Sequence, residues 1–128
     1  MANSISASNG IVSTGPDGVG YATGAGGTNT QATNKVTGVT LNKICGQITM
    51  NAASLAAATI VSHVLTNSSI AAGDVLILNH LSGGTVGAYT LNARCAAGSA
   101  TIDLRNNTAG ALAEAVVYAF AVIKAVAA

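Results

Sequence analysis

The residues that could do chemistry in this chain are few and far apart. The two histidines, His63 and His80, have no second ligand at metal spacing, and no cysteine or acidic cluster accompanies them. The four acids are too widely separated to nominate a catalytic pair. The sequence therefore predicts no enzyme, no metal and no cofactor. We expect hydrogen-bonded structural or interface histidines, with pH sensing at a subunit interface as the alternative.

Each acid has a structural role open to it. Asp17 and Asp74 lie in turns, where aspartate bonds its own backbone. Asp103 and Arg105 lie two apart on one expected strand face, so we expect a lateral ion pair between them. Glu114 precedes the last apolar run and is expected to meet a backbone amide or a neighbouring cation.

Glycines crowd the beginning of the chain and invite comparison with phosphate-binding loops. They include Gly18, Gly20, Gly24, Gly26 and Gly27. Their spacing does not match G-x-G-x-x-G, and neither an apolar strand before them nor a helix after them is expected. A phosphate-binding loop is therefore rejected.

Two Asn-X-Ser/Thr triplets match the N-glycosylation pattern. They are Asn67-Ser68-Ser69 and Asn106-Asn107-Thr108. Residues 1–5 lack the basic region and apolar run of a signal peptide, so we interpret both triplets as chance matches and expect assembly in a cytoplasm. In that reducing compartment Cys45 and Cys95 are expected to be buried free thiols rather than a disulfide.

Charge is scarce in this chain. Only 7% of the residues are charged and 50% are hydrophobic, against roughly 25% charged in an ordinary soluble domain. The five basic residues are scattered and the net charge is +1, so no nucleic-acid partner is expected. The longest charge-free part of the apolar C-terminal stretch, residues 115–123, is far shorter than the roughly 20 residues of a spanning helix. We therefore expect no membrane partner and a surface partly covered by other copies.

The chain divides into an arm and a domain. Residues 1–34 are rich in Gly, Thr and Asn and lack apolar periodicity, so they cannot form a core of their own. We expect either a flexible arm or an extended strand that orders against a neighbour. Residues 35–128 change to short β-branched runs between Gly, Asn and Ser clusters, which predicts a β domain.

Seven strands are expected in the domain, and an eighth if the arm supplies one. Their ranges are 36–41, 44–50, 60–67, 75–81, 89–96, 99–105 and 115–126. Spacing of about 8–12 residues with glycine-rich turns predicts an all-β fold, an antiparallel sandwich or jelly roll. In the last strand large side chains alternate with Ala119 and Ala121, which favours a strand buried on both faces over the alternative of a helix.

Several short motifs resemble a module of the structural proteins of tailed bacteriophages and prophages. The similarity covers about residues 19–125 and is carried by residues 20–27, 30–35, 37–43, 46–50 and 113–124. In that family such modules occur as head-decoration or head-fibre proteins and within tail-fibre-like proteins. The resemblance therefore implies a part of a virus particle, and no catalytic residue.

The short chain leaves no room for a fibre shaft, which favours a capsid decoration (cement) protein. The resemblance then implies a homotrimer on the virion surface that binds the major capsid protein. The alternatives are a tail or fibre component, including a receptor-binding tip, and a non-viral self-associating adhesin. Interface residues are expected in the arm and on the small-residue face of the last strand, namely Tyr21, Gly24, Gly26, Gly27, Ala119 and Ala121.

Overall fold

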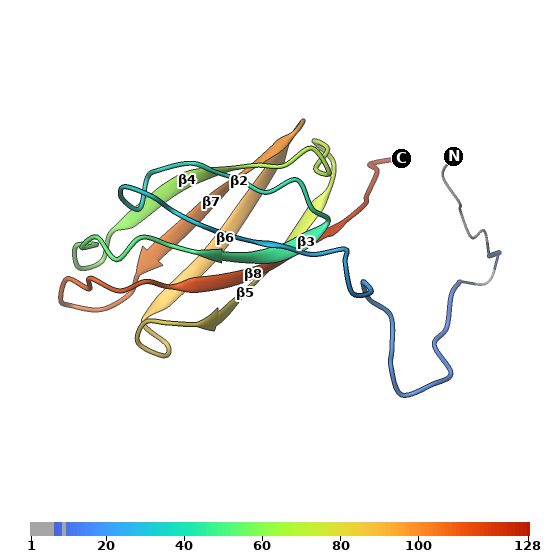
Figure 1. Cartoon of the computed structure of the whole chain (residues 1–128), viewed down its shortest axis with the longest axis horizontal. Helices are drawn as coiled ribbons and strands as arrows, with labels where there is room; N and C mark the ends of the chain where they lie inside the picture. The colour runs from blue at the N-terminus through green and yellow to red at the C-terminus, as the bar shows by residue number, and fades with distance from the viewer. Residues whose placement is uncertain (1–6, 9) are drawn as a thin grey trace.

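Eight strands and no helix form in the part of the chain that the computed structural model describes, residues 7–8 and 10–128 (Figure 1). They are β1 (Thr28–Thr30), β2 (Val39–Thr40), β3 (Cys45–Thr49), β4 (Ile60–Thr66), β5 (Val75–Ser82), β6 (Tyr89–Ala96), β7 (Ser99–Asn106) and β8 (Val117–Ile123). A first sheet has the order β1-β3-β8-β5, and a second sheet has the order β2-β4-β7-β6. The two sheets pack together, so the predicted all-β sandwich is confirmed.

The core lies between the two sheets and follows from period-two alternation. Tyr118, Phe120 and Val122 point inward from β8, and Ile102 and Leu104 point inward from β7. All five side chains are buried. Because alternate residues of a strand point to opposite faces, the intervening positions form the outer face of each sheet.

The first expected strand, 36–41, is much shorter than predicted. Only Val39–Thr40 pair, and they pair in parallel with β4. The reason is that Gln31 donates its side-chain amide to the carbonyl oxygens of Lys35 and Thr37, at 3.0 and 2.8 Å. Val36 between them is exposed, so the chain turns here instead of extending.

The arm contributes the eighth strand. β1 lies within residues 1–34 and pairs in parallel with β3, from Thr28 beside Gln47 to Thr30 beside Thr49. The sheets are therefore mixed at these two short strands, whereas the long strands are antiparallel as expected. Residues 10–23 lie outside the sandwich and run out beyond its end (Figure 1).

Two buried asparagines shape the loops that follow β4 and β7. Asn67 has no exposed surface, donates to the carbonyl oxygen of Lys43 at 2.7 Å and accepts from the Ser69 N–H at 2.9 Å. An asparagine that accepts from the amide two residues on forms an Asx turn. The Asn67-Ser68-Ser69 triplet is thus a turn, and its buried side chain offers no place for a glycan.

Asn106 holds the second of these loops. Its amide nitrogen lies 3.1, 3.2 and 2.8 Å from the carbonyl oxygens of Leu55, Ala56 and Gly110, and its oxygen accepts from Thr108. The side chain is fully buried. Asn106 therefore joins the β3–β4 connection to the β7–β8 connection, two segments remote in sequence.

We predict that Asn106→Ala lowers the free energy of unfolding by roughly 2–4 kcal/mol, because it leaves buried carbonyl groups without donors. Urea unfolding followed by circular dichroism measures the change. Asn107→Ala is the matched control: that exposed neighbour bonds only the Thr90 hydroxyl, and its removal should change stability by no more than about 0.5 kcal/mol. Equal effects of the two substitutions would contradict the assigned role of Asn106.

Candidate functional site

The acidic side chains of the described domain are occupied by structural hydrogen bonds. The Glu114 carboxylate accepts from the Thr85 N–H at 2.9 Å, the Thr85 hydroxyl at 2.7 Å and the Tyr89 hydroxyl at 2.7 Å. These bonds, with that from Tyr89 first, lower the pKa of Glu114. The expectation that Glu114 meets a backbone amide is confirmed. Its role is to hold the loop between β5 and β6.

Asp103 pairs with a different arginine from the one expected. Its carboxylate accepts from Arg94 of the neighbouring strand β6 and from the Ser62 hydroxyl of β4. The predicted lateral pair with Arg105 is wrong, because Arg94 lies diagonally across the β6–β7 ladder and reaches the carboxylate first. Hydrogen bonds from Ser62 and then Arg94 lower the pKa of Asp103.

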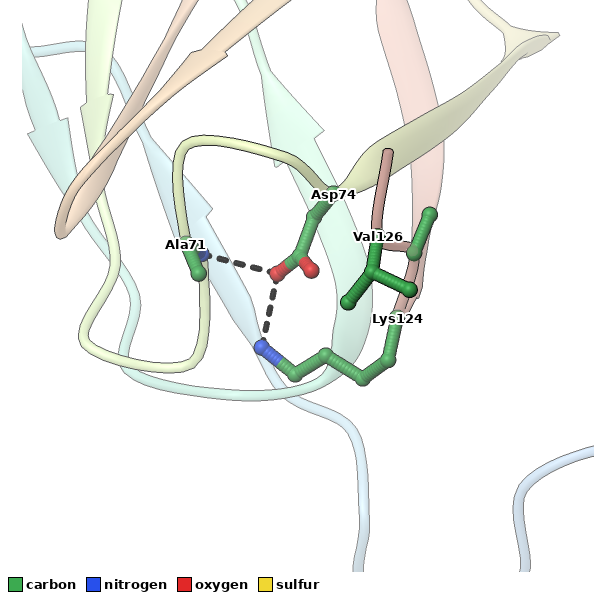
Figure 2. A pocket seen from close by; sticks show the side chains of 5 residues that line it. Ala71, Asp74, Lys124 and Val126 are labelled. Carbon is green, nitrogen blue, oxygen red and sulfur yellow. Dashed lines mark hydrogen bonds and ion pairs between the residues drawn. The ribbon is translucent and has the colours of Figure 1, made fainter. Parts of the chain in front are cut away.

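An open hollow at the end of the first sheet is lined by Ala71, Asp74, Lys124, Ala125 and Val126. Figure 2 shows the Asp74 carboxylate bonded to both the Ala71 N–H, at 2.7 Å, and the Lys124 ammonium, at 2.6 Å. The bond from Lys124 is the main cause of the lowered pKa of Asp74. The expected turn role of Asp74 is confirmed, and the hollow contains no free nucleophile or acid.

His63 is buried between the sheets and joins them. Its Nε2 lies 2.8 Å from the Tyr118 hydroxyl, so a residue of β4 meets a residue of β8. Nδ1 is buried without a partner among the described residues. If Tyr118 donates to Nε2, only the Nδ1–H is unpaired, whereas the reverse assignment strands both Nδ1 and the tyrosine O–H. The first arrangement is the better one, and it needs a neutral imidazole.

We predict that the His63–Tyr118 pair makes the fold acid-sensitive. Burial lowers the pKa of His63 from 6.5 to about 4, although Asp103 opposes the shift. The unfolded chain therefore binds a proton that the folded chain refuses between these values. The contribution is complete above pH 6.5, and about 3 kcal/mol should be lost as the pH falls toward 4.

Urea unfolding at several pH values measures this loss. His63→Gln should remove that part of the slope, whereas His80→Gln should keep it, since His80 bonds only the Gly83 carbonyl at the surface. An unchanged slope in His63→Gln would refute the prediction. The buried position confirms a hydrogen-bonded structural role for His63, with no second ligand near it.

Metal chemistry has no support in the described residues. No group of three or more His, Cys, Asp or Glu side chains there could hold an ion. Cys45 and Cys95 are free thiols and only partly buried, so the expected full burial is not met. Burial raises the pKa of the Cys95 thiol, which makes it a poor nucleophile.

The feature that needs an explanation is the outer face of the first sheet. It presents a continuous set of apolar side chains from β5 and β8, which we call the apolar face: Val75, Ile77, Val117, Ala119, Ala121 and Ile123. Val75 and Ile77 are each 53% exposed, and Ile123 is 45% exposed. Adjacent exposed apolar residues of this kind mark interaction surfaces.

The second sheet is different on its outer side. Only Ile60 and Val64 are large apolar residues there, both on β4. The remaining outward positions of β4, β7 and β6 are mostly polar or charged: Ser62, Thr66, Thr90, Asn92, Arg94, Ser99, Thr101, Asp103 and Arg105. The two faces of the sandwich are therefore chemically unlike.

The predicted interface residues form two groups. Ala119 lies on the apolar face between Gln47 and Asn79, and Ala121 lies there between Cys45 and Ile77. Both alanines are half-buried, so β8 is covered fully on its inner face only, and the prediction of burial on both faces is wrong for this chain alone. The small side chains leave the middle of the apolar face low.

The other predicted interface residues lie at the root of the arm. The Tyr21 hydroxyl donates to the Val122 carbonyl at the end of β8. A Cβ on Gly26 would lie 3.4 Å from the Cys45 sulfur, and one on Gly27 would lie 3.0 Å from Leu41. Gly24 has a φ of +96°, a conformation suited to glycine. Tyr21, Gly26 and Gly27 thus contact their own domain, and their role toward a partner stays a prediction.

Sequence reasoning missed Val75, Ile77 and Ile123 as surface residues. The available signal was the nearly unbroken apolar run 75–81, which lacks the polar alternation of a half-exposed strand. Such a run indicates burial on both faces. It does not say whether the covering surface belongs to the same chain.

No protein-family model, curated protein or solved structure matches this chain. Within the described residues, no helix is long and apolar enough to cross a membrane. The function is therefore argued from the site itself, an uncovered apolar face beside a projecting arm.

Proposed function

We propose that this chain is a structural subunit of a tailed-phage particle, a decoration protein that binds the outer face of the head as an oligomer and stabilises it. The observation that carries the proposal is the apolar face, with Val75, Ile77 and Ile123 exposed on one side of an otherwise polar sandwich. A subunit in an assembly can cover such a face, whereas a monomer exposes it to water at a cost.

The distribution of titratable groups supports a structural role. Glu114, Asp103 and Asp74 are all engaged by donors that hold loops or strands. Lys35 is only 3% exposed and donates to the carbonyls of Asn51 and Glu114, which fixes the start of the domain. These groups stabilise the fold, and none is left in a cleft where it could act on a substrate.

The projecting arm also fits a subunit that attaches to neighbours. Residues 10–23 are exposed throughout and contain Asp17 as their one charged residue. An extended segment of this kind binds by lying in a groove or along a strand, and ordering it costs conformational entropy that a partner surface must offset. A particle lattice supplies such surfaces in many copies.

We predict that the chain is found on the heads of particles of the virus that encodes it, in repeated copies. Cryo-electron microscopy and mass spectrometry of purified particles check this. Particles made without the protein should release DNA at a lower temperature or after a milder osmotic shock, and added protein should restore resistance. Density at the tail tip would contradict the head assignment and favour the tail or fibre alternative.

A further inference from the structure

We propose that the apolar face of one subunit binds the arm, residues 10–23, of a second copy of this chain. Neighbouring subunits are then tied together by exchanged arms. The inference rests on the oligomeric structural role proposed above and names the partner surface. The face and the arm belong to the same polypeptide, so every copy in a closed ring gives one arm and receives one.

The arm has apolar side chains with nothing to pack against in its own domain. Ile11, Val12 and Val19 are 65%, 79% and 81% exposed. Between Gly10 and Gly20 the only side-chain hydrogen bond is local, from the Ser13 hydroxyl to the Gly15 carbonyl. The first bond from the arm to the sandwich is that of Tyr21. The arm is therefore an unpartnered apolar ligand of about the composition that the apolar face requires.

The root of the arm directs it outward. The Tyr21 hydroxyl fixes it to the end of β8 at Val122, and Gly26 lies against Cys45 of β3. From there the chain runs beyond the end of the sandwich rather than back across its own sheet (Figure 1). A second copy placed beside this end is the surface that the arm meets.

Length and charge both suit this pairing. Residues 11–20 span about 33 Å when extended, and the eight residues of β5 span about 27 Å, so an arm can cross a neighbour's apolar face. The face contains no charged side chain, and Asp74 and Lys124 at its end are already paired with each other. Burial of the face therefore strands no ion. The low middle at Ala119 and Ala121 leaves room for arm side chains.

The test uses the full-length protein and two variants, with mass measured by light scattering after gel filtration. Ile77→Lys places a charge on the apolar face, and deletion of residues 2–20 removes the arm but keeps Tyr21. Each variant alone should be a monomer, whereas the unchanged protein should be an oligomer. Val64→Lys is the matched control, since Val64 is equally apolar and 45% exposed on the other sheet. It should keep the oligomer.

The decisive step is to mix the two variants. The arm-deleted copy keeps a working face and the Ile77→Lys copy keeps a working arm, so they should form a one-to-one heterodimer although neither self-associates. Circular dichroism and melting curves show that each variant is folded. An arm-deleted protein that remains an oligomer, a mixture that stays monomeric, or an unchanged protein that is monomeric at micromolar concentration overturns the proposal.

This outcome is independent of the particle experiment. Arm exchange in solution with no protein on phage heads would refute the decoration role and leave the inference intact. Decorated heads together with an unaltered mass of the Ile77→Lys variant would do the reverse.

Discussion

The sandwich depends on buried polar side chains that bond the backbone of its long connections. Backbone N–H and C=O groups taken out of water need partners, and irregular loops cannot supply all of them. Gln31, Lys35, Asn67 and Asn106 do so here, and each is nearly or fully buried. They lie at the ends of the sheets, and each accepts from or donates to segments distant along the chain. The small core can therefore carry loops that contain little apolar anchorage of their own.

The same constraint explains which strands the sequence predicted well. From Ile60 to Asn106 the apolar and polar residues alternate between clear glycine and asparagine turns, and three of the four strands there match the expected ranges within one residue at each end, β6 without any difference. Prediction was poorest at residues 36–41, where Gln31 claims the carbonyls of Lys35 and Thr37. A side chain that competes with a ladder from outside the segment leaves no trace in the periodicity of that segment.

The candidate site was predictable only in part, for a related reason. The large and small alternation of β8 marked Ala119 and Ala121 as a distinct face, and the structure places both on the apolar face. Val75 and Ile77 gave no such mark, because an apolar run indicates coverage without naming the covering chain. The arm glycines were identified by composition, but the contacts of Gly26 and Gly27 with their own domain depend on the parallel β1–β3 pairing, which no local pattern predicts.

Low charge content becomes intelligible once the two outer faces are compared. Arg94 and Asp103 pair on the outer side of the second sheet, and Asp74 and Lys124 pair at the end of the first, so the apolar face is free of ions. A charge there would have to be desolvated whenever that surface is covered, at a cost that a weak contact could not offset. Keeping ions off one side while pairing them on the other gives the subunit a direction: one face suited to contact with protein and one suited to water. A lone sandwich has no need of that asymmetry, whereas a subunit fixed in one orientation within an assembly does.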